Sequence, residues 1–186
     1  MIEIRFNREQ LDRIDRLIER APRQMPKVMA RAINRAIETT RTEASRKIRE
    51  TYYIKAKDIK ASLTLKKASA GDLTARITSR GSTIPLTKFK VKPQKPQPKR
   101  RLVVVARVKK GAGGPISGAF VAQMRSGHIG VFNRVAGPRL PITQRFGPAV
   151  PQMLGGREVI THVQEKTTER LMGRLEHEVG RVLGGN

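Results

Sequence analysis

The sequence lacks cysteine and tryptophan, and it is poor in the other aromatic residues. Its 186 residues include only two Tyr and five Phe. Without cysteine the chain can form no disulfide, no thiolate zinc site and no cysteine nucleophile. The scarcity of aromatic rings also disfavours the base-stacking platforms that read single-stranded RNA. Tyr52 and Tyr53 lie far in the sequence from the most basic stretch, so we expect them to be spatially separate from it.

Long hydrophobic segments are missing as well. The N-terminus, MIEIRFNREQ, is charged and has no apolar stretch, so we expect no signal peptide. No apolar run approaches the roughly 18 residues of a membrane-spanning helix, and we expect no membrane partner. Hydrophobic residues make up 38% of the chain, which is enough for a modest core. We therefore expect a single domain over residues 1–186 that is made in the cytoplasm.

Acidic residues are absent from a long internal segment. The formal net charge is +24, and residues 73–157 contain seventeen Lys and Arg but no Asp or Glu. A chain with this balance repels copies of itself and attracts polyanions. Nucleic acid is the first candidate partner and an acidic protein is the second. A membrane surface is third, because no basic amphipathic helix with an aromatic face is evident.

The most basic stretch, KFKVKPQKPQPKRRLVVVARVKK, contains three prolines and no acid. Prolines favour an extended polyproline geometry, and phosphate binding needs cations within reach rather than at a fixed spacing. We predict a protruding basic loop over residues 92–101. We expect the cations of the whole stretch to contact DNA or an acidic partner, with a merely solvated surface as the alternative. They are Lys88, Lys90, Lys92, Lys95, Lys99, Arg100, Arg101, Arg107, Lys109 and Lys110.

Helical periodicity is strongest near the two ends of the chain. Ile2, Ile4 and Phe6 alternate as in a short strand, and Asn7 suits the N-cap of a following helix. Apolar residues at helical spacing predict further helices over roughly 24–50, 54–63 and 157–183. In the first of these, small residues such as Ala36 allow close packing against a sheet or a partner helix.

The middle of the chain has the character of strands. We predict strands at Leu63–Lys67, Leu73–Ser79, Ile84–Val91 and Leu102–Val108. A hairpin is predicted from Ala119–Met124 and His128–Val135, closed near Ser126–Gly127. A proline-rich segment, Pro138–Pro151, leads to the last helix. The pattern predicts an α+β fold, with long N-terminal helices and a C-terminal helix packed on a mostly antiparallel sheet, and with an extended basic loop.

No motif in the sequence indicates catalysis. His128, His162 and His177 have no metal-binding spacing, and the glycine-rich GAGGPISG lacks the Lys-Ser/Thr pair of a phosphate-binding loop. The acids near the C-terminus, such as Glu165 and Glu169, are spaced to balance neighbouring cations. We expect no catalytic residue, no metal and no cofactor.

Residues 118–154, GAFVAQMRSGHIGVFNRVAGPRLPITQRFGPAVPQML, carry the most specific pattern. They resemble the minor tail protein Z family, the tail completion proteins of lambda-like phages. The matching elements are Gly118–Phe120, the hairpin return with Gly127, His128, Gly130–Phe132 and Arg134, then Arg139–Ile142, and finally Val150–Met153. The segment RAINRAI, residues 31–37, is similar to the family's long N-terminal helix.

This resemblance implies a structural protein of the virion, at the head-proximal end or neck of a long tail. The implied partners are further copies in a ring, often six-fold, tail terminator or tail tube proteins, head-completion or neck proteins, and the phage DNA end. The candidate contacts between subunits are Phe120, His128, Phe132, Arg134, Arg139, Pro141 and Pro151. Gly127 and Gly130 are expected to permit turn or bulge geometry.

Two other functions remain open from the sequence. A general RNA-binding or ribosome-associated protein would suit the sequence pI near 11.6. A small nuclease would need clustered acids or histidines, which the sequence does not supply.

Overall fold

A computed structural model describes residues 9, 12, 16, 19, 24–97 and 102–183. The predicted strand at Ile2, Ile4 and Phe6 and the N-cap at Asn7 lie outside these residues. Of the helix predicted to follow, the four described residues are Glu9, Asp12, Arg16 and Glu19, and each is helical and exposed.

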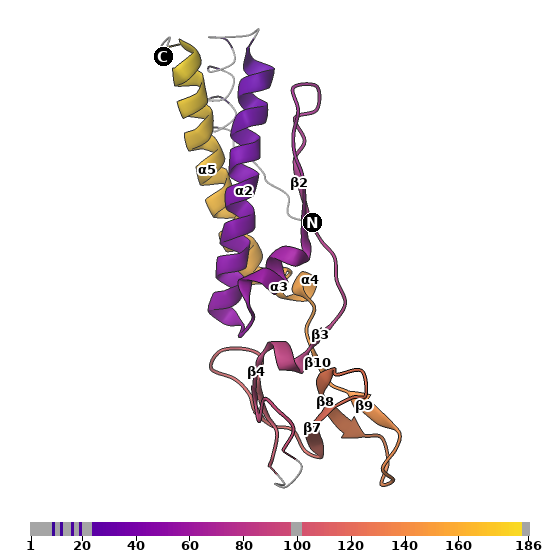
Figure 1. Cartoon of the computed structure of the whole chain (residues 1–186). Helices are drawn as coiled ribbons and strands as arrows, with labels where there is room; N and C mark the ends of the chain where they lie inside the picture. Colours follow the sequence, from indigo (N-terminus) through magenta and orange to yellow (C-terminus); the bar gives the residue numbers. More distant parts are fainter. Residues whose placement is uncertain are drawn as a thin grey trace.

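Two long helices form one end of the molecule. Helix α2 extends over Met25–Thr51 and helix α5 over Arg157–Leu183, and they lie side by side (Figure 1). Both confirm the ranges expected from apolar periodicity. Pro26 stands in the first turn of α2, where its missing N–H costs no helical hydrogen bond. The helix ends where Tyr52 becomes extended.

Two of the small residues of α2, Ala32 and Ala36, pack against a partner helix. Ala32 and Ala36 are buried, and they form a cluster with Leu171, Met172 and Leu175 of α5. Alanines at such positions let two helix backbones approach closely, because no long side chain stands between them. Of the two packing modes that the sequence leaves open, Ala32 and Ala36 show the helix pair, whereas Ala44 shares a hydrophobic cluster with Leu63 and Ile77 of the strands.

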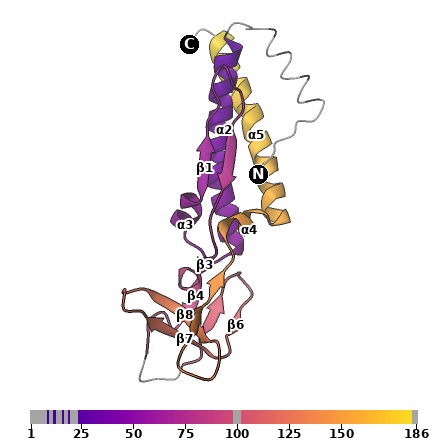
Figure 2. The ribbon, with the colours of Figure 1, turned by 90° about the vertical axis from the view of Figure 1, so that its right-hand side faces the viewer.

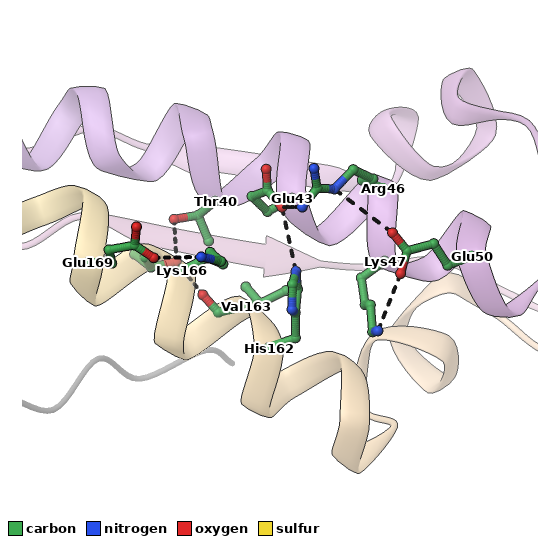
Figure 3. Close-up of polar contacts among 10 residues, drawn as sticks. Thr40, Glu43, Arg46, Lys47, Glu50, His162, Val163, Lys166 and Glu169 are labelled. Carbon is green, nitrogen blue, oxygen red and sulfur yellow. Dashed lines mark hydrogen bonds and ion pairs between the residues drawn. The ribbon is translucent and has the colours of Figure 1, made fainter.

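A buried polar contact lies within this helix pair. The hydroxyl oxygens of Thr40 on α2 and Thr167 on α5 are 2.7 Å apart. Each also lies within hydrogen-bonding distance of the carbonyl four residues earlier, Ala36 at 2.9 Å and Val163 at 2.6 Å. Two hydroxyl protons are available for these three contacts, and each hydroxyl has an acceptor for its proton without leaving the interface. Figure 3 shows this region of the interface.

A β-hairpin and two short helices accompany the helix pair. Helix α3 (Ala56–Ala61) leads into β1 (Leu63–Lys66), which pairs antiparallel with β2 (Arg76–Ser79). The hairpin runs along α2 (Figure 2). Asn34 of α2 bonds both backbone groups of Ala68, donating to its carbonyl at 2.9 Å and accepting from its N–H at 2.8 Å. Helix α4 (Val150–Leu154) precedes α5. We call α2–α5 with β1–β2 the helical part.

The other end of the molecule is built from short strands and is called here the β-lobe, residues 84–149 (Figure 1). One sheet has the order β4-β5-β6, from Lys90–Lys92, Val105–Arg107 and Gly114–Pro115. A second has the order β7-β8-β9, from Ala119–Gln123, Ile129–Arg134 and Ile142–Gln144. At the end of the β-lobe that joins the helical part, β3 (Ile84–Pro85) pairs with β10 (Phe146–Gly147).

The α+β class is confirmed, and every pairing between strands is antiparallel. The strands form four small sheets in the described part of the chain, where we expected one. The predicted strand at Ile84–Val91 is interrupted by the 3-10 helix η1 (Leu86–Lys88), which follows Pro85. Proline has no N–H for a ladder, so a continuous strand is disfavoured there. The proline-rich segment at residues 138–151 contains β9, β10 and the start of α4.

One hydrophobic cluster joins the helical part to the β-lobe. Ile48 of α2, Met153 of α4 and Val163 of α5 share it with Val91 of β4 and Val131 of β8. All five side chains are buried, with at most 2% exposed. The lobe therefore does not depend only on its own short ladders, which in isolation are marginally stable.

We predict that Ala36→Leu destabilises the protein by about 1–3 kcal/mol, because the added methylenes must force apart two helices that are already in close contact. Arg35→Leu at the adjacent, exposed position is the matched control and should change stability by less than about 0.5 kcal/mol. Urea unfolding followed by circular dichroism gives both values. Equal effects of the two substitutions would contradict tight packing at Ala36.

Candidate assembly surface

The acidic residues are confined to one part of the molecule. All fifteen Asp and Glu precede residue 73 or follow residue 157, so the β-lobe has none. Within the helical part, acids are engaged by neighbouring cations, as in the contact of Glu38 with Lys67 at 2.8 Å and of Glu178 with Arg31 at 3.4 Å. Figure 3 shows further pairs along α2, including Lys47 with Glu50. The separation gives the molecule one mixed-charge end and one purely cationic end.

Three carboxyl groups of the helical part have lowered pKa values. A hydrogen bond from Lys67 lowers the pKa of Glu38, and one from Lys166 lowers the pKa of Glu169. The pKa of Asp72 is lowered first by the backbone N–H of Thr74, at 2.9 Å, and then by Lys66. All three groups are exposed and remain ionised at neutral pH. They are committed to partners within the same chain.

The ten cations predicted as contacts do not form one surface. Three of them, called here the junction cations, lie against the helical part. Lys88 is 3.3 Å from Asp58 of α3, while Lys90 lies 5.1 Å from the ring centre of Tyr53 and Lys109 5.7 Å from that of Tyr52. These are ion-pair and cation–π distances.

The contacts of the junction cations show that one prediction was wrong. We expected Tyr52 and Tyr53 to be remote from the basic stretch, but the chain returns to them after β5. The N–H of Tyr53 donates to the Val108 carbonyl at 2.9 Å, and the N–H of Lys110 donates to the Thr51 carbonyl at 2.8 Å. A separation of about fifty residues in sequence hid this contact.

Two of the remaining cations, Lys92 and Lys95, are called here the loop cations. Both are exposed, and within the described residues neither forms an ion pair. They flank Pro93, at the start of the predicted basic loop. Arg107 and Lys110 are also exposed. The other three predicted contacts, Lys99, Arg100 and Arg101, lie outside the described residues.

The seven candidate subunit contacts also separate. Phe120 of β7 and Phe132 of β8 pair across the hairpin with ring centres 6.3 Å apart, and Arg134 lies 5.8 Å from the ring of Phe120. Phe132 is buried and Phe120 is half-buried.

The other candidate contacts lie elsewhere. Exposed His128 contacts Gln144 of β9 at 3.0 Å. Arg139 and Pro141 are exposed between β8 and β9, whereas Pro151 belongs to α4 and lines a different hollow together with β2.

Sequence analysis missed a set of exposed apolar residues on the β-lobe. We expected Leu102–Val108 to form one strand, but β5 begins only at Val105. Leu102 is 46% exposed and Val103 64%. Three other large apolar side chains are also exposed. Val135 and Leu140 lie between β8 and β9 in the sequence, and Phe146 belongs to β10. The run Leu102–Val105 reads as core by composition, and only the structure reveals that its first half is at the surface.

An open groove of about 990 Å³ lies beside this exposed run. Its lining joins the prolines of the basic stretch to the hairpin: Pro93, Pro96, Gln97, Leu102, Val103, Ile116, Gly118, all of β7, Asn133, Arg134, Ala136 and Gly137. Exposed apolar surface of this kind on a cationic lobe is typical of a binding surface.

The hairpin geometry explains two glycines. Gly127 has φ of +82°, a left-handed conformation that closes the turn as expected. Gly130 lies within β8, where a Cβ would stand 2.7 Å from the ring of Phe132. A side chain at residue 130 would therefore displace that ring.

We predict that Gly130→Ala destabilises the protein by about 1–3 kcal/mol through this clash. Gly137→Ala introduces the same methyl group where nothing lies within 4 Å, and it should be neutral or slightly stabilising. Thermal unfolding of both variants tests the difference. A Gly130→Ala protein as stable as the Gly137→Ala protein would show that the ring moves at no cost.

No feature of the described residues points to metal chemistry or to membrane insertion. In these parts of the chain, no three His, Asp or Glu side chains come together as metal ligands would. His162 is 3.5 Å from Glu43, across the helix pair (Figure 3), and it does not line the groove. Nor does any described helix combine the length and apolar character needed to cross a bilayer.

Comparison with known proteins gives one match. A family model described as prophage minor tail protein Z (GPZ) matches residues 9–184. No curated protein and no solved structure matches the chain. The matched range includes both long helices and the whole β-lobe, whereas the resemblance found in the sequence was specific only over residues 118–154.

Proposed function

Because the chain belongs to the family of prophage minor tail protein Z, and is therefore a phage minor tail protein, we propose that it completes the head-proximal end of the tail. In this role it prepares the tail to join a DNA-filled head and helps to position the genome end. The role is structural rather than catalytic.

The observation that carries this proposal is the acid-free β-lobe at the end of the molecule away from the helix pair. Double-stranded DNA carries one negative charge per about 1.7 Å of its axis, and a cationic surface binds it by releasing counterions. A ring of such chains, six-fold in our proposal, would bring one β-lobe per subunit to a common channel. The lobes would then surround the leading DNA end.

The division among the cations refines this proposal. The junction cations are already held by Asp58, Tyr52 and Tyr53, so their role is to attach the lobe to α2 and α3. The loop cations and the basic residues that follow them are the groups that we assign to the polyanion. Their target is the DNA end or an acidic face of a tail terminator, tail tube or neck protein. The geometry disfavours RNA binding by base stacking, since each tyrosine has a lysine over its ring.

We predict that a prophage deleted for this gene makes full heads and tails that do not join. Electron microscopy with an infectivity count tests this. Joined particles with low infectivity would limit the role to placement of the DNA end. Normal particles with normal infectivity would contradict the proposal as a whole.

We further predict that replacing four loop residues by Gln lowers infectivity by at least about tenfold, because the attraction to phosphate is removed. The residues are Lys95, Lys99, Arg100 and Arg101. The control replaces four exposed cations of the helical part, Arg35, Arg49, Arg170 and Arg174, and so makes the same change in net charge. Equal infectivity of the two variants would contradict a specific role for the loop.

A further inference from the structure

Strand β7 lies at an outer edge of its sheet, and its pairing with β8 determines which of its backbone groups face outward. The order is β7-β8-β9, so within the described residues no strand pairs with the second edge of β7. The N–H of Met124 donates to the His128 carbonyl at 2.8 Å, which makes this a hydrogen-bonded pair. Such pairs alternate with non-bonded pairs along antiparallel strands.

The alternation assigns each residue of β7. Phe120 and Ala122, opposite Phe132 and Gly130, exchange hydrogen bonds with β8. Val121 and Gln123 therefore direct their N–H and C=O groups away from β8. Two neighbouring bonds agree with this assignment. The N–H of Ala119 donates outward, to Ile116 at 3.2 Å, and the carbonyl of Val131, opposite Val121, accepts from Arg145 on the far side of β8.

Within the described residues, the outer edge of β7 lacks the features that usually protect an edge strand. Proteins block such edges with lysine, proline or a covering segment. The neighbouring sheet follows this rule, because one of its edge strands, β4, has the sequence Lys90-Val91-Lys92 and the other, β6, ends in Pro115. Strand β7, with the sequence AFVAQ, contains neither charge nor proline.

The groove brings residues of other segments next to β7. All five residues of β7 line it, and Pro93, Pro96, Leu102 and Val103 line it as well. Two of these residues, Leu102 and Val103, are largely exposed. An extended segment placed in the groove could bond to β7 with its backbone and bury apolar side chains against Leu102 and Val103. Strand addition of this kind is a common mode of peptide recognition.

We propose that the β7 edge and its groove bind, by strand addition, an extended segment of a partner protein in which Asp or Glu alternates with apolar residues. Alternation is required because successive side chains of a strand point to opposite faces. The acidic side chains suit exposed Arg134 and the loop cations, in a lobe that has no acid of its own. A second copy suits the site less well, since even outside residues 73–157 the chain has more bases than acids. This inference goes beyond the proposed function and does not depend on it.

The first test uses a short fluorescein-labelled peptide of alternating Glu and Val with the full-length protein. Fluorescence anisotropy should show binding, and a Lys-Val peptide of equal length should not bind. Hydrogen exchange followed by NMR gives the decisive pattern. The Val121 and Gln123 amides should gain protection when the peptide binds, whereas those of Phe120 and Ala122 should be protected already.

Matched variants test the backbone contact itself. Val121→Pro removes the outward N–H at a position where an edge strand tolerates proline, and it should weaken peptide binding about tenfold. Val121→Ala loses the same side chain but keeps the N–H, so it should bind several-fold more tightly than Val121→Pro. If Val121→Pro does not fold, a peptide N-methylated at alternate residues tests the same bond from the other side and should fail to bind.

Three outcomes would overturn the proposal. The first is equal binding of the Pro and Ala variants, or of the methylated and unmethylated peptides. The second is unchanged exchange at Val121 and Gln123 under saturating peptide. The third is a single-stranded DNA oligonucleotide that protects these amides while the Glu-Val peptide does not, which would assign the groove to nucleic acid.

Discussion

The close contact of α2 with α5 is the constraint on which the rest of the molecule depends. These helices lie near the two ends of the chain, and of the other labelled elements all except α3, α4 and the hairpin β1–β2 belong to the β-lobe between them. Ala32 and Ala36 allow the helices to touch, and because the pair is antiparallel the chain leaves α2 and enters α5 at the same end of the pair. The pairing of β3 with β10, in which Ile84 lies opposite Gly147, brings the two ends of the β-lobe together.

The distribution of charge follows the same division into a helical part and a β-lobe. Long exposed helices carry many cations here, and acids three or four residues away, as in the pair Lys166–Glu169, offset their repulsion. The β-lobe receives no such compensation. It is held instead by the hydrophobic cluster shared with the helices and by the junction cations, whose partners Asp58, Tyr52 and Tyr53 belong to the helical part. Self-repulsion within the lobe is thus offset by an attachment that combines apolar packing with one ion pair and two cation–π contacts.

The sequence was sufficient for elements whose signal is local. Twenty-seven residues of amphipathic periodicity define α2 and α5, and glycine at residue 127 with alternating residues on each side defines the hairpin β7–β8. It was insufficient where a strand of two or three residues depends on a distant partner. Phe146–Gly147 is a strand only because Ile84–Pro85 lies beside it, and no periodicity can be read over two residues.

The candidate surface shows the same difference between what the sequence predicts and what only the fold reveals. Composition alone located the cationic middle of the chain, because a count of charges needs no fold. The same count treated the stretch from Lys88 to Lys110 as one arm, although the fold assigns its members different tasks. Lys88, Lys90 and Lys109 secure the lobe to the helical part, whereas Lys92 and Lys95 remain exposed next to a groove. Lys90 and Lys92 also guard the edge of their own sheet. An unguarded strand in the neighbouring sheet is therefore informative, because the chain demonstrably has the means to protect an edge and has not used them at β7.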